Sequence, residues 1–168
     1  MSPYLGLPLL VFLAGLQGWL AQTLSPTTNL RPELLLLAAV ACGLLGGYRA
    51  GLVWGALAGL LFDLGSAGPL GAGLICMAAV GCLSGLGQAG GPRFNRLLPL
   101  QAAALATIVY DLLYMLLLQL SGWGFNLIVA IYEVALPSAL LSLVLMPAVY
   151  GPVYWLWHRA RPGREASR

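Results

Sequence analysis

Long apolar segments separated by short polar loops dominate the pattern of this chain. The segments occupy residues 3–24, 33–47, 50–64, 69–89, 97–120 and 125–157. A helix needs about 20 residues to cross the hydrocarbon core of a membrane, and somewhat fewer where its ends are accommodated. The pattern therefore predicts an all-α integral membrane protein, built as a compact bundle of six transmembrane helices.

The last apolar segment is too long for a single span. Trp155 and Trp157 suit the inner membrane interface, and counting back about 20 residues from them places the start of the span near 134–137. Pro137 favours a helix start or a kink there. We expect residues 125–135 to form an interfacial helix on the outer face or a bent extension of the last span.

The arginines indicate the orientation of the bundle. All eight basic residues are arginines, and with a cytoplasmic N-terminus the outer loops hold only Arg31. The inner loops and the tail hold Arg49, Arg93, Arg96, Arg159, Arg161, Arg164 and Arg168. Because positive residues concentrate on the cytoplasmic side, both termini are predicted to be inside. We divide the chain into a transmembrane domain, 1–158, and a basic cytoplasmic tail, 159–168.

Composition narrows the classes of function. Sixty per cent of the residues are hydrophobic and 8% are charged, which a soluble core with a polar surface does not allow. The net charge of +3 suits anionic lipid head groups, and the basic cluster is too small for a nucleic-acid site. No nucleophile–base set, phosphate-binding loop, metal-ligand cluster or paired carboxylate stands in the sequence. We expect no enzymatic activity and no cofactor.

A ridge of glycines is the densest pattern in the chain. Gly51, Gly55 and Gly59 recur every fourth residue, so they share one face of a helix. Small residues on one face let helix backbones approach closely in lipid, where no hydrophobic force drives association. We expect this helix to be central, and its ridge either packs within the chain or docks a partner helix.

Two aspartates lie in apolar surroundings. Asp63 precedes the turn 64–71, where its carboxylate either caps the next helix or binds a cation or substrate. Asp111 falls near mid-membrane, where a charge costs about 2.5–3.5 kcal/mol, so it should face inward. Three roles for Asp111 stay open: a polar contact with Gln17, Gln101 or a tyrosine, coupling to an ion or proton, or contact with a partner.

The segment 49–85 resembles the rod shape-determining protein MreD family. The resemblance lies in Arg49, the glycine ridge, Asp63 and the turn Gly68-Pro69-Leu70-Gly71; residues 136–140 and 146–150 also look like that family's last helix. The region around Glu133 carries little of it. The residues singled out as structural or partner-binding candidates are Arg49, Gly51, Gly55, Gly59, Asp63, Gly68, Pro69, Gly71, Asp111, Pro137 and Pro147.

The resemblance implies a non-enzymatic scaffold in the bacterial inner membrane. It implies a place in the elongation machinery beside the bitopic protein MreC. Through MreC it implies indirect association with the actin-like MreB filament and with the transglycosylase and transpeptidase of the lateral wall. These partners would support lateral peptidoglycan synthesis and cell shape.

The predicted layout is also similar to the substrate-binding subunits of energy-coupling-factor vitamin transporters. Such a subunit needs an outer pocket lined by polar and aromatic groups, whereas polar side chains are few in these spans. This transporter subunit is the alternative function. A closed outer cavity involving Asp63, Asp111 and Tyr114 would favour it, and tight packing there would favour the scaffold.

Overall fold

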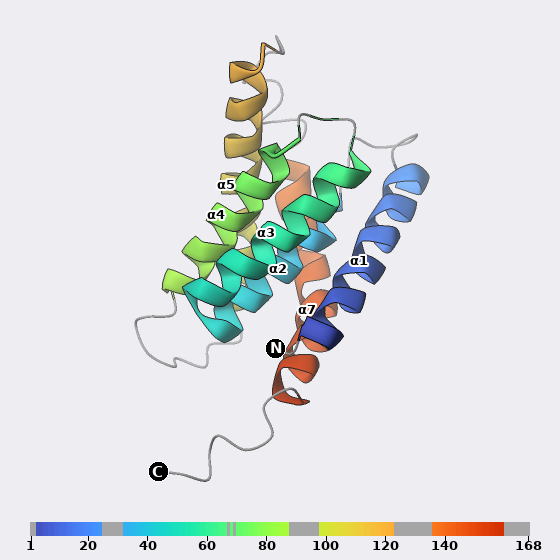
Figure 1. Ribbon diagram of the computed structural model, residues 1–168, viewed down its shortest axis with the longest axis vertical. Helices are drawn as coiled ribbons and strands as arrows, with labels where there is room; N and C mark the ends of the chain where they lie inside the picture. Colours follow the sequence, from blue (N-terminus) through green and yellow to red (C-terminus); the bar gives the residue numbers. More distant parts are fainter. Residues whose placement is uncertain are drawn as a thin grey trace.

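A computed structural model describes residues 3–24, 32–66, 68, 70–87, 98–122 and 136–159. These residues form α-helices, labelled as in Figure 1. The helices are α1 (Pro3–Leu24), α2 (Leu34–Gly46), α3 (Tyr48–Gly65), α4 (Ala72–Leu86), α5 (Leu98–Leu120) and α7 (Leu136–Arg159). The segment 125–135, Pro69 and the arginine tail beyond Arg159 lie outside the described residues.

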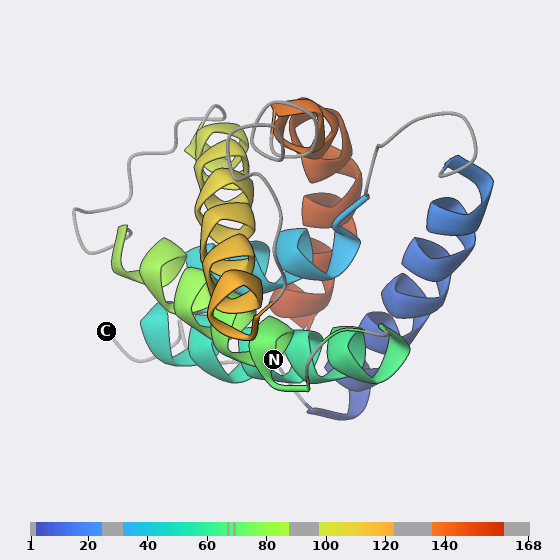
Figure 2. The same ribbon diagram turned by 90° about the horizontal axis from the view of Figure 1, so that it is seen from above.

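The helices α3 and α4 lie side by side along their whole length (Figures 1 and 2). Seen from above in Figure 2, α5 crosses this pair, and α1 lies at the edge of the bundle. The α5 helix also contacts α7, and α7 contacts α2. The bundle therefore combines a tight unit of α2, α3 and α4 with the pair α5 and α7, and α1 covers one side.

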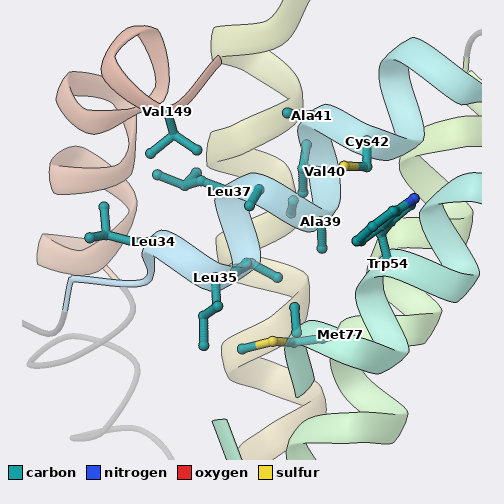
Figure 3. Close-up of a cluster of buried hydrophobic side chains, with 14 of the residues drawn as sticks. Leu34, Leu35, Leu37, Ala39, Val40, Ala41, Cys42, Trp54, Met77 and Val149 are labelled. Carbon is teal, nitrogen blue, oxygen red and sulfur yellow. The ribbon is translucent and has the colours of Figure 1, made fainter. Parts of the chain in front are cut away.

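The centre of the bundle is α2, so the prediction that the glycine-ridge helix is central was wrong. Every residue from Leu34 to Leu44 is buried, and α2 contacts each of the other five described helices. Figure 3 shows its side chains between those of Trp54, Met77 and Val149. The reason is chemical: α2 has no polar face, so helices can surround it on all sides. The ridge of α3 occupies one face only, and its other face exposes Leu52 and Val53.

Three described helices are long and apolar enough to cross a membrane, with windows at Gly6–Thr23, Pro99–Leu120 and Pro137–Trp157. The apolar helices α2 and α4 are shorter, with 13 and 15 residues. A helix of that length rises about 20 Å, less than the roughly 30 Å of a hydrocarbon core. The structure thus agrees with a helical membrane protein, and the count of six spans stays a prediction.

Two of the three prolines of α7, Pro137 and Pro147, occupy different environments. Pro137 lies in the first described turn, where a missing N–H group removes no intrahelical hydrogen bond. Pro147 lies inside the helix and is exposed, so it leaves a backbone carbonyl of the preceding turn without its usual donor. Neither proline lies in the buried centre around α2.

Candidate functional site

The glycine ridge of α3 is in direct contact with α4. A Cβ atom added at any of its three glycines would meet the backbone of α4. Gly51 faces Gly81, Gly55 faces Met77 and Ala78, and Gly59 faces Gly73 and Leu74. The same chain therefore covers the ridge, which is the intramolecular alternative considered from the sequence. A partner helix has no access to this face of α3 in the structure.

The carboxylate of Asp63 caps the N-terminus of α4. Its Oδ1 accepts a hydrogen bond from the backbone N–H of Gly73 at 2.9 Å. Its Oδ2 accepts two more, from Gly71 at 2.9 Å and from Leu74 at 3.1 Å. These N–H groups have no partner inside the helix, and the positive end of the helix dipole favours a negative charge there. The latch geometry expected for Asp63 is present, and the side chain is only 3% exposed.

The turn between α3 and α4 is shaped to reach this carboxylate. Gly71 has φ 99°, in the left-handed region where glycine avoids the strain of other residues. Gly71 leads the chain into α4, and its own N–H group donates to the carboxylate of Asp63. Gly68 lies against the hydroxyl of Tyr114, at 2.7 Å from the place where a Cβ would stand. The turn is thus fixed by Asp63 on one side and by α5 on the other.

Aromatic rings fill the space beside Asp63. Phe62 meets Tyr110 and Tyr114 edge-on, with centroid distances of 6.4 and 6.1 Å. Tyr110 and Tyr114 are stacked at 5.7 Å. Tyr114 is therefore packed against Phe62 and Tyr110.

A pocket of about 300 Å³ lies elsewhere, between α4, α5 and the end of α2. Its lining includes Leu44, Val80, Leu83 and Leu105, with Ser84 and Gln101 as polar members. Asp63, Asp111 and Tyr114 do not line it. The pocket therefore differs in position and chemistry from the outer cavity that the transporter alternative needs.

Asp111 faces the interior, as its cost in lipid predicts. It is 6% exposed on α5, beside Thr107, whose hydroxyl donates a 2.8 Å hydrogen bond to Ser142 of α7. The two glutamines considered as hydrogen-bond partners of Asp111 have other environments. Gln17 accepts a hydrogen bond from the backbone N–H of Leu35 through its Oε1 at 3.0 Å, and Gln101 is exposed.

Glu33 is a buried carboxyl that the sequence analysis missed. It precedes α2 and is 7% exposed, although its side chain makes no capping hydrogen bond to that helix. Its position after a polar loop makes it look like an exposed residue at the head groups. The unbroken apolar run that begins at Leu34 was a signal of its burial. A helix surrounded by others on all sides also buries the residues at its start.

Arg49 is the second residue of α3, in the first turn after Gly47. Its Nε donates a hydrogen bond to the hydroxyl of Tyr48 at 2.9 Å, and its guanidinium carbon stands 5.6 Å from the centre of the same ring. Both side chains are exposed. Exposed arginines and aromatic rings are typical of membrane interfaces.

The family of the chain follows from a family-model comparison. The model for the rod shape-determining protein MreD matches residues 3–159, which include every described helix. The chain belongs to the MreD family. Its role is therefore in rod-shape determination, and the resemblance seen in residues 49–85 is confirmed. No curated protein and no solved structure matches the chain.

Proposed function

We propose that this MreD protein is a non-enzymatic scaffold of the bacterial inner membrane. It binds MreC and, through MreC, supports lateral peptidoglycan synthesis by the machinery that includes MreB and the lateral-wall transglycosylase and transpeptidase. The family match over residues 3–159 carries this proposal. The long apolar helices support its placement in a membrane.

The most unusual residues make contacts within the chain, and this also supports a scaffold. The glycine ridge joins α3 to α4, and the carboxylate of Asp63 is occupied by three backbone N–H groups. A substrate ligand needs free coordinating atoms, whereas these groups hold the bundle together. The proposed role of the α2–α3–α4 unit is to present a rigid surface to lipid and to partner helices.

The topology proposed for this scaffold has six spans with both termini inside. In that orientation α2 and α4 run from the outer to the inner face, and Arg49 lies at the inner interface. Their short length is compatible with burial among other helices, since protein and thinned lipid replace the missing hydrocarbon contact. The arginine asymmetry of the loops supports this arrangement.

Depletion of the protein from its own bacterium tests the proposed function. We expect rods to become round and the incorporation of labelled wall precursors along the side wall to stop. Re-expression of the wild type or of Val53→Leu should restore both, because Val53 is 53% exposed. Depleted cells that keep their width and their side-wall labelling would contradict the proposal.

A further inference from the structure

The pocket between α4 and α5 opens toward the outside of the bundle. Its volume is about 300 Å³, and its walls come from the end of α4, the first turns of α5 and Leu44 of α2. Leu83 of α4 and Leu105 of α5 line the pocket and are both exposed. In a membrane, exposed leucines on apolar helices face lipid, so lipid chains have direct access to this pocket.

The lining of the pocket changes from polar to apolar along the two helices. Its polar members are Ser84, in the last turn of α4, and Gln101, in the first turn of α5. Farther from these helix ends the lining is apolar, with Val80, Ala106 and Val109. The α5 helix rises by about 12 Å between Gln101 and Val109. A polar end and an apolar depth match the ester and phosphate groups of a phospholipid and one of its acyl chains.

The polar end of the pocket lies at a basic end of the bundle. The start of α3 packs against the last turn of α4, since a Cβ atom added at Gly85 would meet the backbone of Tyr48. The next residue, Arg49, is exposed. In the sequence, the segment 88–97 that joins α4 to α5 contains two arginines and no acidic residue. Positive charge at this end favours an anionic ligand, by about fivefold for each arginine near a membrane surface.

The size of the pocket and its surroundings narrow the choice of occupant. An α-helix with its side chains is about 10–12 Å across, so a pocket of this volume suits a flexible chain better than a partner helix. Lipid tails are as apolar as the lining, and the hydrophobic effect therefore does not drive occupancy. Filling the pocket instead restores dispersion contacts that an empty space lacks. The preference for one lipid over another then depends on its head group.

We propose that this pocket binds one acyl chain of an anionic phospholipid, with the phosphate group at the polar end. The amide of Gln101 is exposed and can donate a hydrogen bond to a phosphate or ester oxygen. Basic pockets between membrane helices are known binding places for anionic head groups. The inference goes beyond the scaffold function, because a lipid site is a property of the isolated protein and needs no MreC.

Photochemical crosslinking of the full-length protein in phosphatidylcholine nanodiscs tests the proposal. Two probes carry a diazirine on the same acyl chain, one a phosphatidylglycerol and the other a phosphatidylcholine, at equal mole fraction. Crosslinked peptides are mapped by mass spectrometry. We expect crosslinks to concentrate in 80–87 and 101–109, with at least about a fivefold higher yield from the phosphatidylglycerol probe.

Pocket-filling variants assign the crosslinks to the pocket. Ala102→Phe places a ring in the space that the chain would occupy, and it should lose most of the crosslinks in both peptides. Ile108→Phe is the matched control, because Ile108 is exposed on the same helix and does not line the pocket. If Ala102→Phe is not recovered folded, Leu83→Phe at the exposed rim replaces it, with the same expected loss.

Charge variants test the preference for an anionic head group. Replacement of Arg49 and of both arginines in 88–97 by glutamine should equalise the yields of the two probes without moving the crosslinks. The matched control replaces three arginines of the tail by glutamine: Arg161, Arg164 and Arg168. This control should keep the preference of the wild type.

Three outcomes overturn the proposal. Crosslinks spread evenly over the lipid-facing side of α5, with none concentrated at the pocket, would leave the pocket to a partner's side chain. Equal yields from the two probes in the wild type would show a cleft that any lipid enters. An Ala102→Phe or Leu83→Phe variant that folds and still crosslinks like the wild type would place the bound chain elsewhere.

Discussion

Gly51 of α3 and Gly81 of α4 meet backbone to backbone. A Cβ atom on either residue would meet the carbonyl oxygen of the other. In a membrane such close approach supplies the dispersion contacts and weak backbone hydrogen bonds that hold helices together. The α3–α4 pair therefore depends on the absence of side chains along one line of residues.

Substitution of Gly55 tests this dependence. In Gly55→Leu the new side chain would meet the backbone of Met77, and overpacking of this kind costs about 1–3 kcal/mol. We expect a lower melting temperature and a lower yield of monodisperse protein in detergent. Val53→Leu is the matched control on the exposed face of the same helix, and equal behaviour of the two variants would show that Gly55 makes no close contact.

Substitution of Asp63 separates a helix cap from a ligand site. Loss of charge alone at a helix N-terminus costs about 0.3–1 kcal/mol. Both carboxylate oxygens accept hydrogen bonds from backbone N–H groups, however. In Asp63→Asn the side-chain NH₂ group would replace one of these oxygens and face a backbone N–H group, which should cost about 1–3 kcal/mol. Asp63→Ala leaves all three N–H groups without an acceptor and should lose more, on the order of 3 kcal/mol.

Melting temperatures and cell shape, measured together, decide between the two roles of Asp63. A cap predicts that shape is lost in proportion to stability, with Asn less severe than Ala. Two variants that melt like the wild type and yet fail equally in cells would instead indicate a ligand role.

Much of the α3–α4 unit was predictable from the sequence. The spacing of Gly51, Gly55 and Gly59 identifies one face of one helix, and a carboxylate before a turn such as 64–71 identifies a cap. Both signals are local, because they depend on residues within one or two helical turns. They needed no knowledge of which helices are neighbours.

The position of α2 and the environment of Glu33 were not predictable in the same way. In an apolar helix a leucine facing lipid and a leucine facing protein look identical, so the run that begins at Leu34 carries no periodicity. The place of Glu33 depends on long-range packing of α2 against α5 and α7. The sequence predicts that Asp111 faces the interior, because a carboxyl group avoids lipid. It does not predict which residues are its neighbours.

The hydrogen bond between Thr107 and Ser142 joins α5 to α7. We expect Thr107→Val and Ser142→Ala each to lower the melting temperature by a few degrees. In a double-mutant cycle the coupling energy should be about 0.6 kcal/mol, as for other hydrogen bonds between membrane helices. A coupling energy of zero would show that the 2.8 Å contact contributes nothing to the packing of the two helices.

Cysteine labelling tests the proposed topology. In a background without Cys42, Cys76 and Cys82, Ala67→Cys should react with an impermeant thiol reagent in intact cells. Asn95→Cys should react only after the inner face is opened. Labelling of Asn95→Cys in intact cells would contradict six spans with a cytoplasmic N-terminus.

Recovery of MreC with the tagged protein from solubilised membranes is the most direct test of the scaffold function. The wild type and Val53→Leu should retain MreC in a fixed ratio, and Gly55→Leu should lose it in step with its folded fraction. An unrelated multi-pass membrane protein carrying the same tag should retain none. Folded wild-type protein that recovers no more MreC than this control would contradict the account.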